Sequence, residues 1–357
     1  MCRLVFVDAR AYNSTNINIR KSMPSRTNSN DVARLAGVSR STVSRVFTDG
    51  AYASAETSER VMKAADQLGY CPNAIARSLS MNRTSLIGVI VGELDNPFYA
   101  DILQVIGVKL QQRRLASLLF VANPSAMDTL IPQVLSYRVD GVIISGATLS
   151  SKMALRCQSA GIPVVLVNRY TDSDLISSVV GDNVDGAGQV ARLFAERGYR
   201  RIGFMAGLPE ASSSRDREHG FRIKLADFGL SVSAREVGSF TLEGGARAAR
   251  AMLCRPDRPE AVFCANDMMA TATIDIARTE FNLRIPEDLA VAGYDNSSLA
   301  GMLAYQLTSV DQNTTLMAEA ALENLLQPSL GAKPPAQVVR IPSKLVERAS
   351  TTLLAAN

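Results

Sequence analysis

The chain contains 357 residues, 47% of them hydrophobic and 20% charged, which is enough for two or three domains at about 150 residues per domain. It has no apolar run of the roughly 18 residues that a membrane span needs, and its opening MCRLVFVDAR holds too short an apolar stretch for a signal peptide, so we expect a cytoplasmic protein. The cysteines show no CxxC spacing, which argues against a disulfide framework and a zinc site: they are Cys2, Cys71, Cys157, Cys254 and Cys264.

The net charge of +4 is distributed unevenly along the chain. Residues 1–85 contain 12 Lys and Arg against 6 Asp and Glu, whereas residues 86–357 contain 26 against 28. A basic segment gains free energy on binding DNA because it releases condensed counterions. The N-terminal part is therefore the candidate for nucleic-acid binding, and the alternative is a basic solvated face without a partner.

The first 26 residues show no hydrophobic periodicity and are rich in Asn, Ser and Thr, as in YNSTNINIRKSMPSRT. This composition predicts a disordered extension. Met23 lies just before the first periodic segment, so a translation start at Met23 is the alternative interpretation of this stretch.

The stretch 31–46, DVARLAGVSRSTVSRV, has the pattern of a helix-turn-helix. Gly37 suits the left-handed backbone position at the end of a first helix, and Ser39 is a good N-cap for a second. The side chains expected to face inward are Val32, Leu35, Ala36, Val43 and Val46. The opposite face of the second helix carries side chains that can reach bases or phosphates in a major groove: Arg40, Ser41, Thr42 and Arg45. An ordinary αα-hairpin with a polar face is the alternative.

A third helix is predicted at about 55–68, with Ser54 as its N-cap and Gly69 after its end. Its expected buried stripe consists of Val61, Met62, Ala65 and Leu68. The segment GYCPNAIARSLSMNRT follows, in which AIARSLS can form only a short helix. About seven residues are too few for a stable isolated helix in water, so we expect its order to depend on DNA or on a partner copy.

From residue 86 onward, apolar runs alternate with helical stretches. Near-continuous apolar strands that are each followed by a helix predict parallel, doubly wound sheets, and the number of strands suits two sheets with a cleft between them. The expected strands are 86–92, 117–122, 141–146, 163–168, 201–207, 261–266 and 289–295. The expected helices are 98–113, 127–137, 151–160, 184–198, 215–229, 243–254, 267–281 and 314–326. The tail, from LTSVDQ to QVVRIPSKLVERAS, would complete the sheets.

The motifs DVARLAGVSRSTVSRV, GYCPNAIARSL, LDNPFYADIL, VVGDNVDGAG, ANDMMATATIDIAR and IPEDLAVAGYDNS are similar to those of one known family. Over residues 28–350 the chain resembles the lac repressor (LacI/GalR) family of bacterial transcription regulators. The resemblance implies a small all-α helix-turn-helix head and a hinge helix, followed by an α/β core like the periplasmic sugar-binding proteins. It also implies a dimer or tetramer on a near-palindromic operator, a small effector, and no cofactor, metal or membrane partner.

The resemblance also implies roles for individual residues of the head and hinge. Arg40, Ser41 and Arg45 fall on positions that contact major-groove bases. Leu79 matches the hinge leucine that wedges between base pairs in the minor groove, and simple packing of a linker helix is the alternative. The remaining expected DNA contacts are Asn28, Ser39, Thr42, Tyr52, Ser54, Thr57, Asn73 and Ala76.

Polar residues that follow the strands should face the cleft, because open α/β sheets bind ligands at the carboxyl ends of their strands. Phe98 is expected to stack on an apolar sugar face, and Arg217 is expected in the loop or first turn of its helix. The resemblance places Arg217, Asn266 and Asp295 on the more regular effector positions. The full expected set is Asp95, Asn96, Phe98, Arg169, Asn183, Arg217, Asn266 and Asp295. The alternatives are helix N-caps for Asn183 and Asn266 and a structural ion pair of Arg169 with Asp182.

These observations predict a ligand-controlled transcription regulator with four parts. The expected boundaries are an extension at 1–26, a head at 27–70, a hinge at 71–85 and a core at 86–350. Within the core we expect an N-subdomain of 86–183 plus 312–328 and a C-subdomain of 184–309 plus 335–350. A soluble sugar-binding protein or a sugar-modifying enzyme on the same core is the alternative. The motifs GxGxxG after an early strand, GxxxxGK[ST], GxSxG and HExxH are absent from the sequence, so an enzyme has little support. The effector is expected to be a sugar or a sugar acid.

Overall fold

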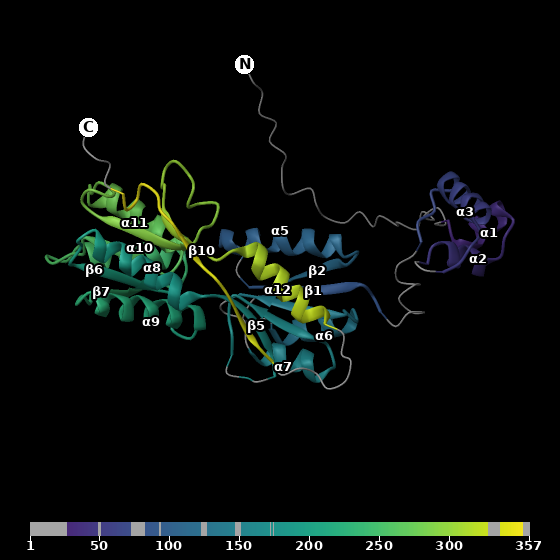
Figure 1. The fold of residues 1–357 in the computed structure, drawn as a ribbon, viewed down its shortest axis with the longest axis horizontal. Helices are drawn as coiled ribbons and strands as arrows, with labels where there is room; N and C mark the ends of the chain where they lie inside the picture. The colour runs from purple at the N-terminus through teal and green to yellow at the C-terminus, as the bar shows by residue number, and fades with distance from the viewer. Residues whose placement is uncertain are drawn as a thin grey trace, which may run out of the picture. The chain divides into compact units, whose positions relative to one another are not determined.

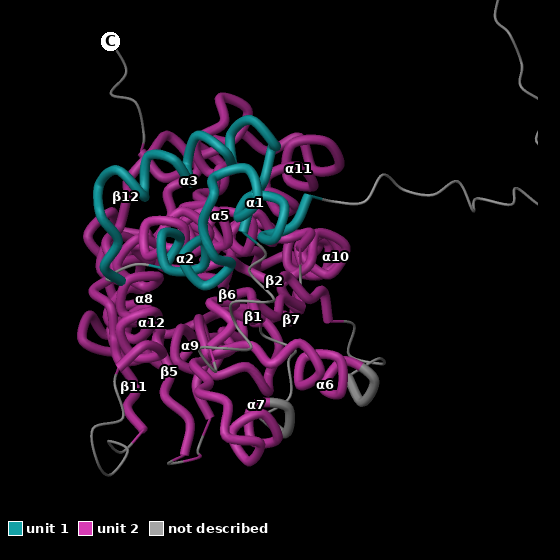
Figure 2. The backbone as a smooth tube through the Cα atoms, turned by 90° about the vertical axis from the view of Figure 1, so that its right-hand side faces the viewer, with its two compact units in different colours: residues 1–82 teal, residues 83–357 magenta. Residues whose placement is uncertain are grey.

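The computed structural model describes residues 27–48, 51–72, 83–92, 94–122, 127–146, 151–171, 173, 175–327 and 336–352. The chain divides into two compact units, residues 1–82 and residues 83–357 (Figure 2). The expected extension with Met23 lies outside the described residues, as do Asn73, Ala76 and Leu79 of the expected hinge. None of the described helices is long and apolar enough to cross a membrane.

The first unit contains the helices α1 (Ser29–Ala36), α2 (Arg40–Val46) and α3 (Ala55–Gln67). Each begins at the N-cap that the sequence predicts, because a side-chain oxygen of Asn28, Ser39 or Ser54 accepts a hydrogen bond from a backbone N–H of the first turn. Gly37, with a φ of 63°, ends α1 in the left-handed conformation that L-residues avoid. The three-helix pattern of the sequence is confirmed.

The core of this unit is small and consists mainly of alanine and valine side chains: Val32, Ala33, Ala36, Val43, Val61, Ala64 and Ala65. Two expectations about it were wrong. Leu35 is 51% exposed and Met62 is 46% exposed, whereas Ala33 and Ala64 are buried in their place. The small side chains let the three helices approach closely, so the longer neighbours remain at the surface.

The second unit contains two six-stranded sheets (Figure 1). The first has the order β11-β5-β4-β3-β1-β2 and is entirely parallel. Its strands are β1 (Leu86–Val91), β2 (Ala116–Val121), β3 (Gly141–Ser145), β4 (Val164–Val167), β5 (Ser177–Gly181) and β11 (Val338–Ile341). Its helices are α5 (Pro97–Gln112), α6 (Met127–Ser136), α7 (Ser151–Ser159) and α12 (Thr314–Leu326).

Both faces of the first sheet are buried, as the continuous apolar strands predicted. Val89 and Ile143 contribute to the cluster formed with α5 and α12. Their neighbours Ile90 and Ile144 contribute to a second cluster, with α6 and α7. Successive side chains of a strand point to opposite faces, so each strand stabilises both clusters.

The second sheet has the order β12-β10-β9-β8-β6-β7 and is parallel except for β12. Its strands are β6 (Ile202–Ala206), β7 (Val232–Val237), β8 (Ala261–Cys264), β9 (Ala290–Asp295), β10 (Thr308–Asp311) and β12 (Lys344–Val346). Its helices are α8 (Asn183–Glu196), α9 (Ser212–Asp227), α10 (Leu242–Leu253) and α11 (Asp267–Glu280). On one face, the ring of Phe204 stacks on that of Phe221 in α9, which in turn contacts Phe194 in α8.

The chain passes between the two sheets at three places, which we call the crossing segments. They are residues 181–183 between β5 and α8, 311–314 between β10 and α12, and 341–344 between β11 and β12. Two doubly wound parallel subdomains were expected and are confirmed. The assignment of the whole stretch 335–350 to the C-subdomain was wrong, because β11 pairs with β5 of the first sheet.

Three elements differ from the sequence-based expectation. Strand β5 was missing from the expected strands, although four of its five residues are buried. Strand β7 was not predicted, because its sequence VSAREV lies at a sheet edge and alternates polar with small residues instead of forming an apolar run. Helix α9 begins at Ser212, three residues before the expected start, and its N-cap position, Ala211, makes no side-chain cap. The run of serines there gave no helical signal in the sequence.

Close packing of α8 on α9 requires a glycine at position 220. A Cβ at Gly220 would lie 2.1 Å from the carbonyl oxygen of Val184, whereas a Cβ at Gly188 would lie 3.6 Å from its nearest neighbour, in Lys224. We predict that Gly220→Ala lowers the free energy of unfolding by about 3 kcal/mol. Gly188→Ala, the matched control in α8, should be neutral or stabilise by about 0.5–1 kcal/mol because alanine favours a helix. Equal urea midpoints for the two variants would contradict this packing.

Candidate functional site

The first unit presents a basic face on helix α2. Arg40 and Arg45 on α2 are exposed, and neither guanidinium has a hydrogen-bond partner among the described residues of this unit. By contrast, Arg34 pairs with Asp31 at 2.6 Å, and Arg60 donates to the carbonyl oxygen of Ala36 at 2.5 Å. The guanidiniums of α2 are thus available for a ligand outside the chain.

Hydroxyl groups surround the beginning of α2. Ser39 Oγ lies 2.7 Å from Ser41 Oγ and 2.9 Å from Thr42 Oγ1, and it caps the helix by accepting from the N–H of Thr42. Tyr52, in the loop before α3, is 86% exposed. A helix N-terminus with several hydroxyls and two exposed guanidiniums is suited to phosphate and base edges.

The second unit has a polar cavity between its two sheets. The residues that line it come from α5 and the loops of the first subdomain, and from α9, β9 and the β7–α10 and β8–α11 loops of the second. They are Asn96, Tyr99, Asn168, Ser213, Arg217, Phe240, Asn266 and Asp295.

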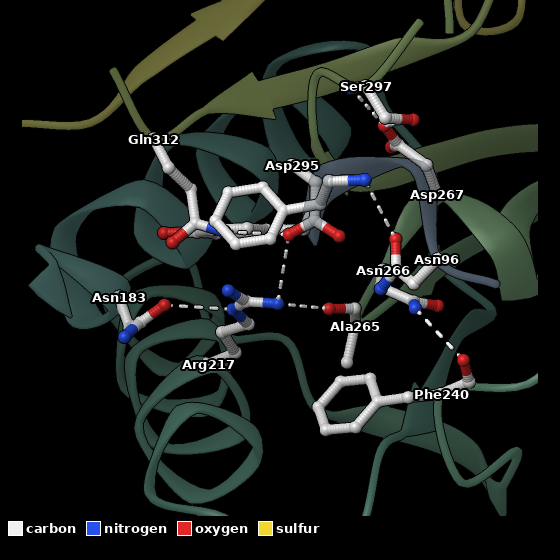
Figure 3. Close-up of polar contacts among 12 residues, drawn as sticks. Asn96, Asn183, Arg217, Phe240, Ala265, Asn266, Asp267, Asp295, Ser297 and Gln312 are labelled. Carbon is white, nitrogen blue, oxygen red and sulfur yellow. Dashed lines mark hydrogen bonds and ion pairs between the residues drawn. The ribbon is translucent and has the colours of Figure 1, made fainter. Parts of the chain in front are cut away.

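Arg217 lies at the centre of this cavity and is 2% exposed (Figure 3). Its Nε donates to Asn183 Oδ1 at 2.8 Å, and its Nη1 donates to the carbonyl oxygen of Ala265 at 2.6 Å. Nη1 also lies 3.5 Å from Asp295 Oδ1, and the guanidinium carbon lies 3.7 Å from the ring centroid of Tyr294. The expected position of Arg217 in a loop or first turn was wrong, since it lies in the second turn of α9.

Asp295 is the acidic partner in this pair and is 5% exposed. Burial raises the pKa of its carboxyl, and the positive charge of Arg217 opposes this rise. Its Oδ1 accepts from Gln312 Nε2 at 2.7 Å. Its backbone has a φ of 117°, a strained value for a residue other than glycine, so surrounding contacts must hold it in place.

Asp267 supplies such contacts immediately next to this residue. It is 1% exposed and accepts from the N–H of Ser297 at 2.7 Å, from Ser297 Oγ at 2.9 Å and from Ser309 Oγ at 2.5 Å. Burial raises the pKa of Asp267, and these hydrogen bonds oppose the rise. They fix the chain two residues after Asp295, so Asp267 supports the cavity without lining it.

Each of the three crossing segments contacts the Arg217–Asp295 pair or the tyrosine beneath it. Asn183, in the first segment, accepts from Arg217, and Gln312, in the second, donates to Asp295. In the third, Ser343 Oγ accepts from Tyr294 Oη at 3.4 Å. A ligand that moves either charge of the pair therefore acts directly on the segments that join the subdomains.

Several buried polar atoms around the pair have no hydrogen-bond partner within the described residues. They include two donors, Arg217 Nη2 and Asn183 Nδ2, and two acceptors, Asn168 Oδ1 and Gln312 Oε1. A buried polar atom without a partner costs about 1–3 kcal/mol, so this set favours a ligand with both donor and acceptor groups. The described residues contain no cluster of His, Cys, Asp and Glu that could hold a metal ion.

The cavity brings together four of the residues expected from the sequence, Asn96, Arg217, Asn266 and Asp295, and Asn183 contacts it through Arg217. Asn266 is also the N-cap of α11, whereas the N-cap of α8 is Asp182 and not Asn183. Three expected residues lie elsewhere. Asp95 is exposed in a turn, Phe98 is packed in the core of the first subdomain, and Arg169 does not line the cavity.

Four lining residues were not predicted: Tyr99, Asn168, Ser213 and Phe240. Asn168 directly follows β4, so its position at a strand end could have revealed it, but Arg169, one residue later, was expected instead. Phe240 follows the unpredicted strand β7, and both it and Ser239 have positive φ. Its ring rests on Gly207, where a Cβ would lie 2.1 Å from the ring, so no local pattern could have revealed it.

Comparisons with known proteins match both units. Residues 30–73 match the family described as bacterial regulatory proteins, lacI family, and residues 191–351 match the periplasmic binding protein-like domain. The HTH-type transcriptional repressor PurR of Photobacterium profundum is 33% identical over 307 residues, covering 83% of this chain and 90% of that protein.

Solved structures are similar over most of the chain as well. The lac repressor dimer bound to operator and the anti-inducer ONPF is 28% identical, with a TM-score of 0.81, and the match covers 92% of this chain and 99% of that one. The complex of the transcriptional regulator CelR with cellobiose is 31% identical, with a TM-score of 0.69, covering 91% and 100% of the two chains.

The buried pair makes a prediction about stability. We expect Arg217→Met to lower the free energy of unfolding by about 3–5 kcal/mol, because Asp295 remains buried without its cation. In urea unfolding, the double variant R217M/D295N should lose clearly less free energy of unfolding than Arg217→Met and Asp295→Asn lose in sum. Arg284→Met is the matched control, since it breaks the exposed pair with Asp288 and should barely move the midpoint. Purely additive losses in the cavity variants would show that the two charges do not interact.

Proposed function

The chain belongs to the lac repressor family of bacterial regulatory proteins, as a DNA-binding transcription regulator with an effector site in its core, and from this premise we propose that it is a repressor. In this proposal it binds a near-palindromic operator as a homodimer. The observation that carries the regulatory part is the buried Arg217–Asp295 pair, which lines the cavity and contacts the crossing segments. The relatives compared above are transcription regulators, so a sugar-binding protein or an enzyme on the same core is not favoured.

Helix α2 is proposed as the recognition helix in the major groove. Arg40, Ser41 and Arg45 would contact bases. All three are exposed, and the guanidiniums of Arg40 and Arg45 have no partner among the described residues of the unit, which supports this assignment. The proposed contacts to the DNA backbone come from Asn28, Ser39, Thr42, Tyr52, Ser54 and Thr57. For the hinge, Leu79 remains proposed as a minor-groove wedge, with Asn73 and Ala76 beside it.

A homodimer is supported by exposed apolar side chains on the first subdomain. Strand β2 lies at the edge of its sheet and exposes Leu119 (50%) and Val121 (58%), and Val108 on neighbouring α5 is 47% exposed. An edge strand with apolar side chains favours association with another chain. In a two-fold homodimer the same patch of each copy covers that of the other.

The charges of the cavity favour a neutral effector. Arg217 is the only cationic residue among those lining the described cavity, and Asp295 already lies against it. A carboxylate would have to compete with Asp295, whereas the hydroxyls of a neutral sugar can bond the unpartnered donors and acceptors around the pair. Phe240 and Tyr99 supply aromatic surface for an apolar sugar face.

We predict that Arg45→Ala weakens binding to the chain's preferred DNA sequence by about 1–3 kcal/mol while binding to random DNA changes much less. Lys63→Ala removes an exposed positive charge on α3 and is the matched control, with a small and sequence-independent effect. Fluorescence anisotropy with both DNAs at one salt concentration measures the difference. An equal loss of affinity on both DNAs would count against base contact by Arg45.

For the effector, we predict that one of D-glucose, D-galactose, D-fructose or D-ribose raises the Tm by about 5 °C or more near 100 times its Kd. D-gluconate and D-galacturonate should give no comparable shift. Asp295→Asn should abolish the shift without loss of operator binding. Asp95→Asn is the matched control, because Asp95 lies outside the cavity and should leave the shift unchanged. A shift from the acids alone would reverse the proposed effector class.

A further inference from the structure

Four side chains at the rim of the cleft join the two subdomains, and we call them the rim latch: Tyr170, Ser212, Asp216 and Arg340. Tyr170 follows β4, and Arg340 lies on β11, so both belong to the first subdomain. Ser212 and Asp216 lie in the first two turns of α9, which belongs to the second subdomain. The rim latch is thus formed by side chains that meet across the cleft.

The contacts of the rim latch are direct. Tyr170 Oη donates to Asp216 Oδ1 at 2.8 Å, and the backbone N–H of Tyr170 donates to Ser212 Oγ at 3.1 Å. Arg340 Nη1 lies 3.7 Å from Asp216 Oδ2, and its guanidinium carbon lies 5.6 Å from the centroid of the Tyr170 ring. A hydrogen bond to a charged carboxylate is stronger than one between neutral groups. Another contact between the subdomains, from the N–H of Ser298 to Asp101, is longer, at 3.4 Å.

The rim latch shares two turns of helix with the cavity. Ser213 and Arg217 line the cavity, and Ser212 and Asp216 precede them by one residue each. Ser213 and Arg217 are four residues apart and share one face of α9, and Ser212 and Asp216 share the adjacent face. Because the helix is rigid over two turns, the latch contacts and the position of the Arg217 guanidinium depend on each other.

We propose that Tyr170 and Asp216 are positioning residues that hold the two subdomains, and with them Arg217, in the arrangement that forms the cavity. The inference rests on the proposed function in that this cavity is taken as the effector site. Neither residue lines the cavity, so the effect on a ligand is indirect. Losing the Tyr170 hydroxyl should change the ratio of closed to open arrangements about two- to tenfold, the usual net effect of one hydrogen bond.

The test measures the distance across the cleft in the full chain without DNA or effector, so it is independent of whether the proposed function holds. Cys254, exposed after α10, carries one spin label, and Gln133→Cys on α6 of the other subdomain carries the second. Cys2 and Cys71 are replaced by serine, while Cys157 and Cys264 are buried. Double electron–electron resonance then gives the distribution of distances between the labels.

Five variants, four single and one double, decide the outcome. Tyr170→Phe and Asp216→Ala should each move population to longer distances about two- to tenfold, and together they should do no more than Asp216→Ala alone. Asp216→Asn should restore most of the short distance, because its amide oxygen still accepts from Tyr170. Tyr305→Phe is the matched control: it loses the hydrogen bond from Tyr305 Oη to Asp275 at 3.2 Å within one subdomain and should change nothing.

Unchanged distances in Tyr170→Phe would overturn the proposal, as would an equal change in Tyr305→Phe. Tyr170 is only half-buried and the substitution removes one oxygen atom, so this variant decides the matter even if Asp216→Ala fails to fold. The urea midpoint of each variant is measured alongside. If the distance change across the variants correlates with the urea midpoint and not with loss of the latch contacts, the proposal is also contradicted.

Discussion

Arg217 and Asp295 lie 3.5 Å apart, each 5% exposed or less, and the organisation of the core depends on that pair. A lone buried charge is so costly that the surrounding chain must supply partners with good geometry. It does so through Asn183, Gln312 and the carbonyl oxygen of Ala265, with the ring of Tyr294 beneath the guanidinium. Two of these partners lie in crossing segments between the subdomains. The requirement to satisfy one ion pair therefore ties the cavity to the joints of the molecule.

In the proposed function, this arrangement lets a small ligand change the relative positions of the two subdomains and, through them, DNA binding by the first unit. A coupling free energy of about 1–3 kcal/mol is enough to change an affinity 5- to 150-fold, which is the range of one or two hydrogen bonds. The unpartnered atoms beside the pair, such as Arg217 Nη2 and Asn168 Oδ1, offer a ligand interactions of that size. Contacts at the rim, through Tyr170 and Asp216, stabilise one arrangement of the subdomains. Gly220 contributes in a different way, since its lack of a side chain allows α8 and α9 to pack closely.

Much of this architecture could be predicted from local sequence patterns. Continuous apolar strands such as those around Val142 and Val165 are buried on both faces, and the N-caps Asn28, Ser39 and Ser54 mark helix starts in the sequence itself. Edge strand β7 and the start of α9 could not be predicted, because their residues lack the apolar periodicity that packing imposes on buried elements.

The cavity was predictable only in part, for the same physical reason. Asn266 and Asp295 lie at strand ends, where topology alone directs side chains to the cleft. Phe240 reaches the cavity because its loop has positive φ and because Gly207 leaves room for its ring, and neither feature is visible in the local sequence. Phe98 packs in the core of the first subdomain, although its neighbours Asn96 and Tyr99 line the cavity.

The central claim is that the cleft controls DNA binding. It is tested most directly by the Kd of the full chain for DNA selected from a random pool, at one salt concentration, with and without a saturating neutral sugar that stabilises the protein. We expect the two values to differ 5- to 150-fold; identical values would contradict the account.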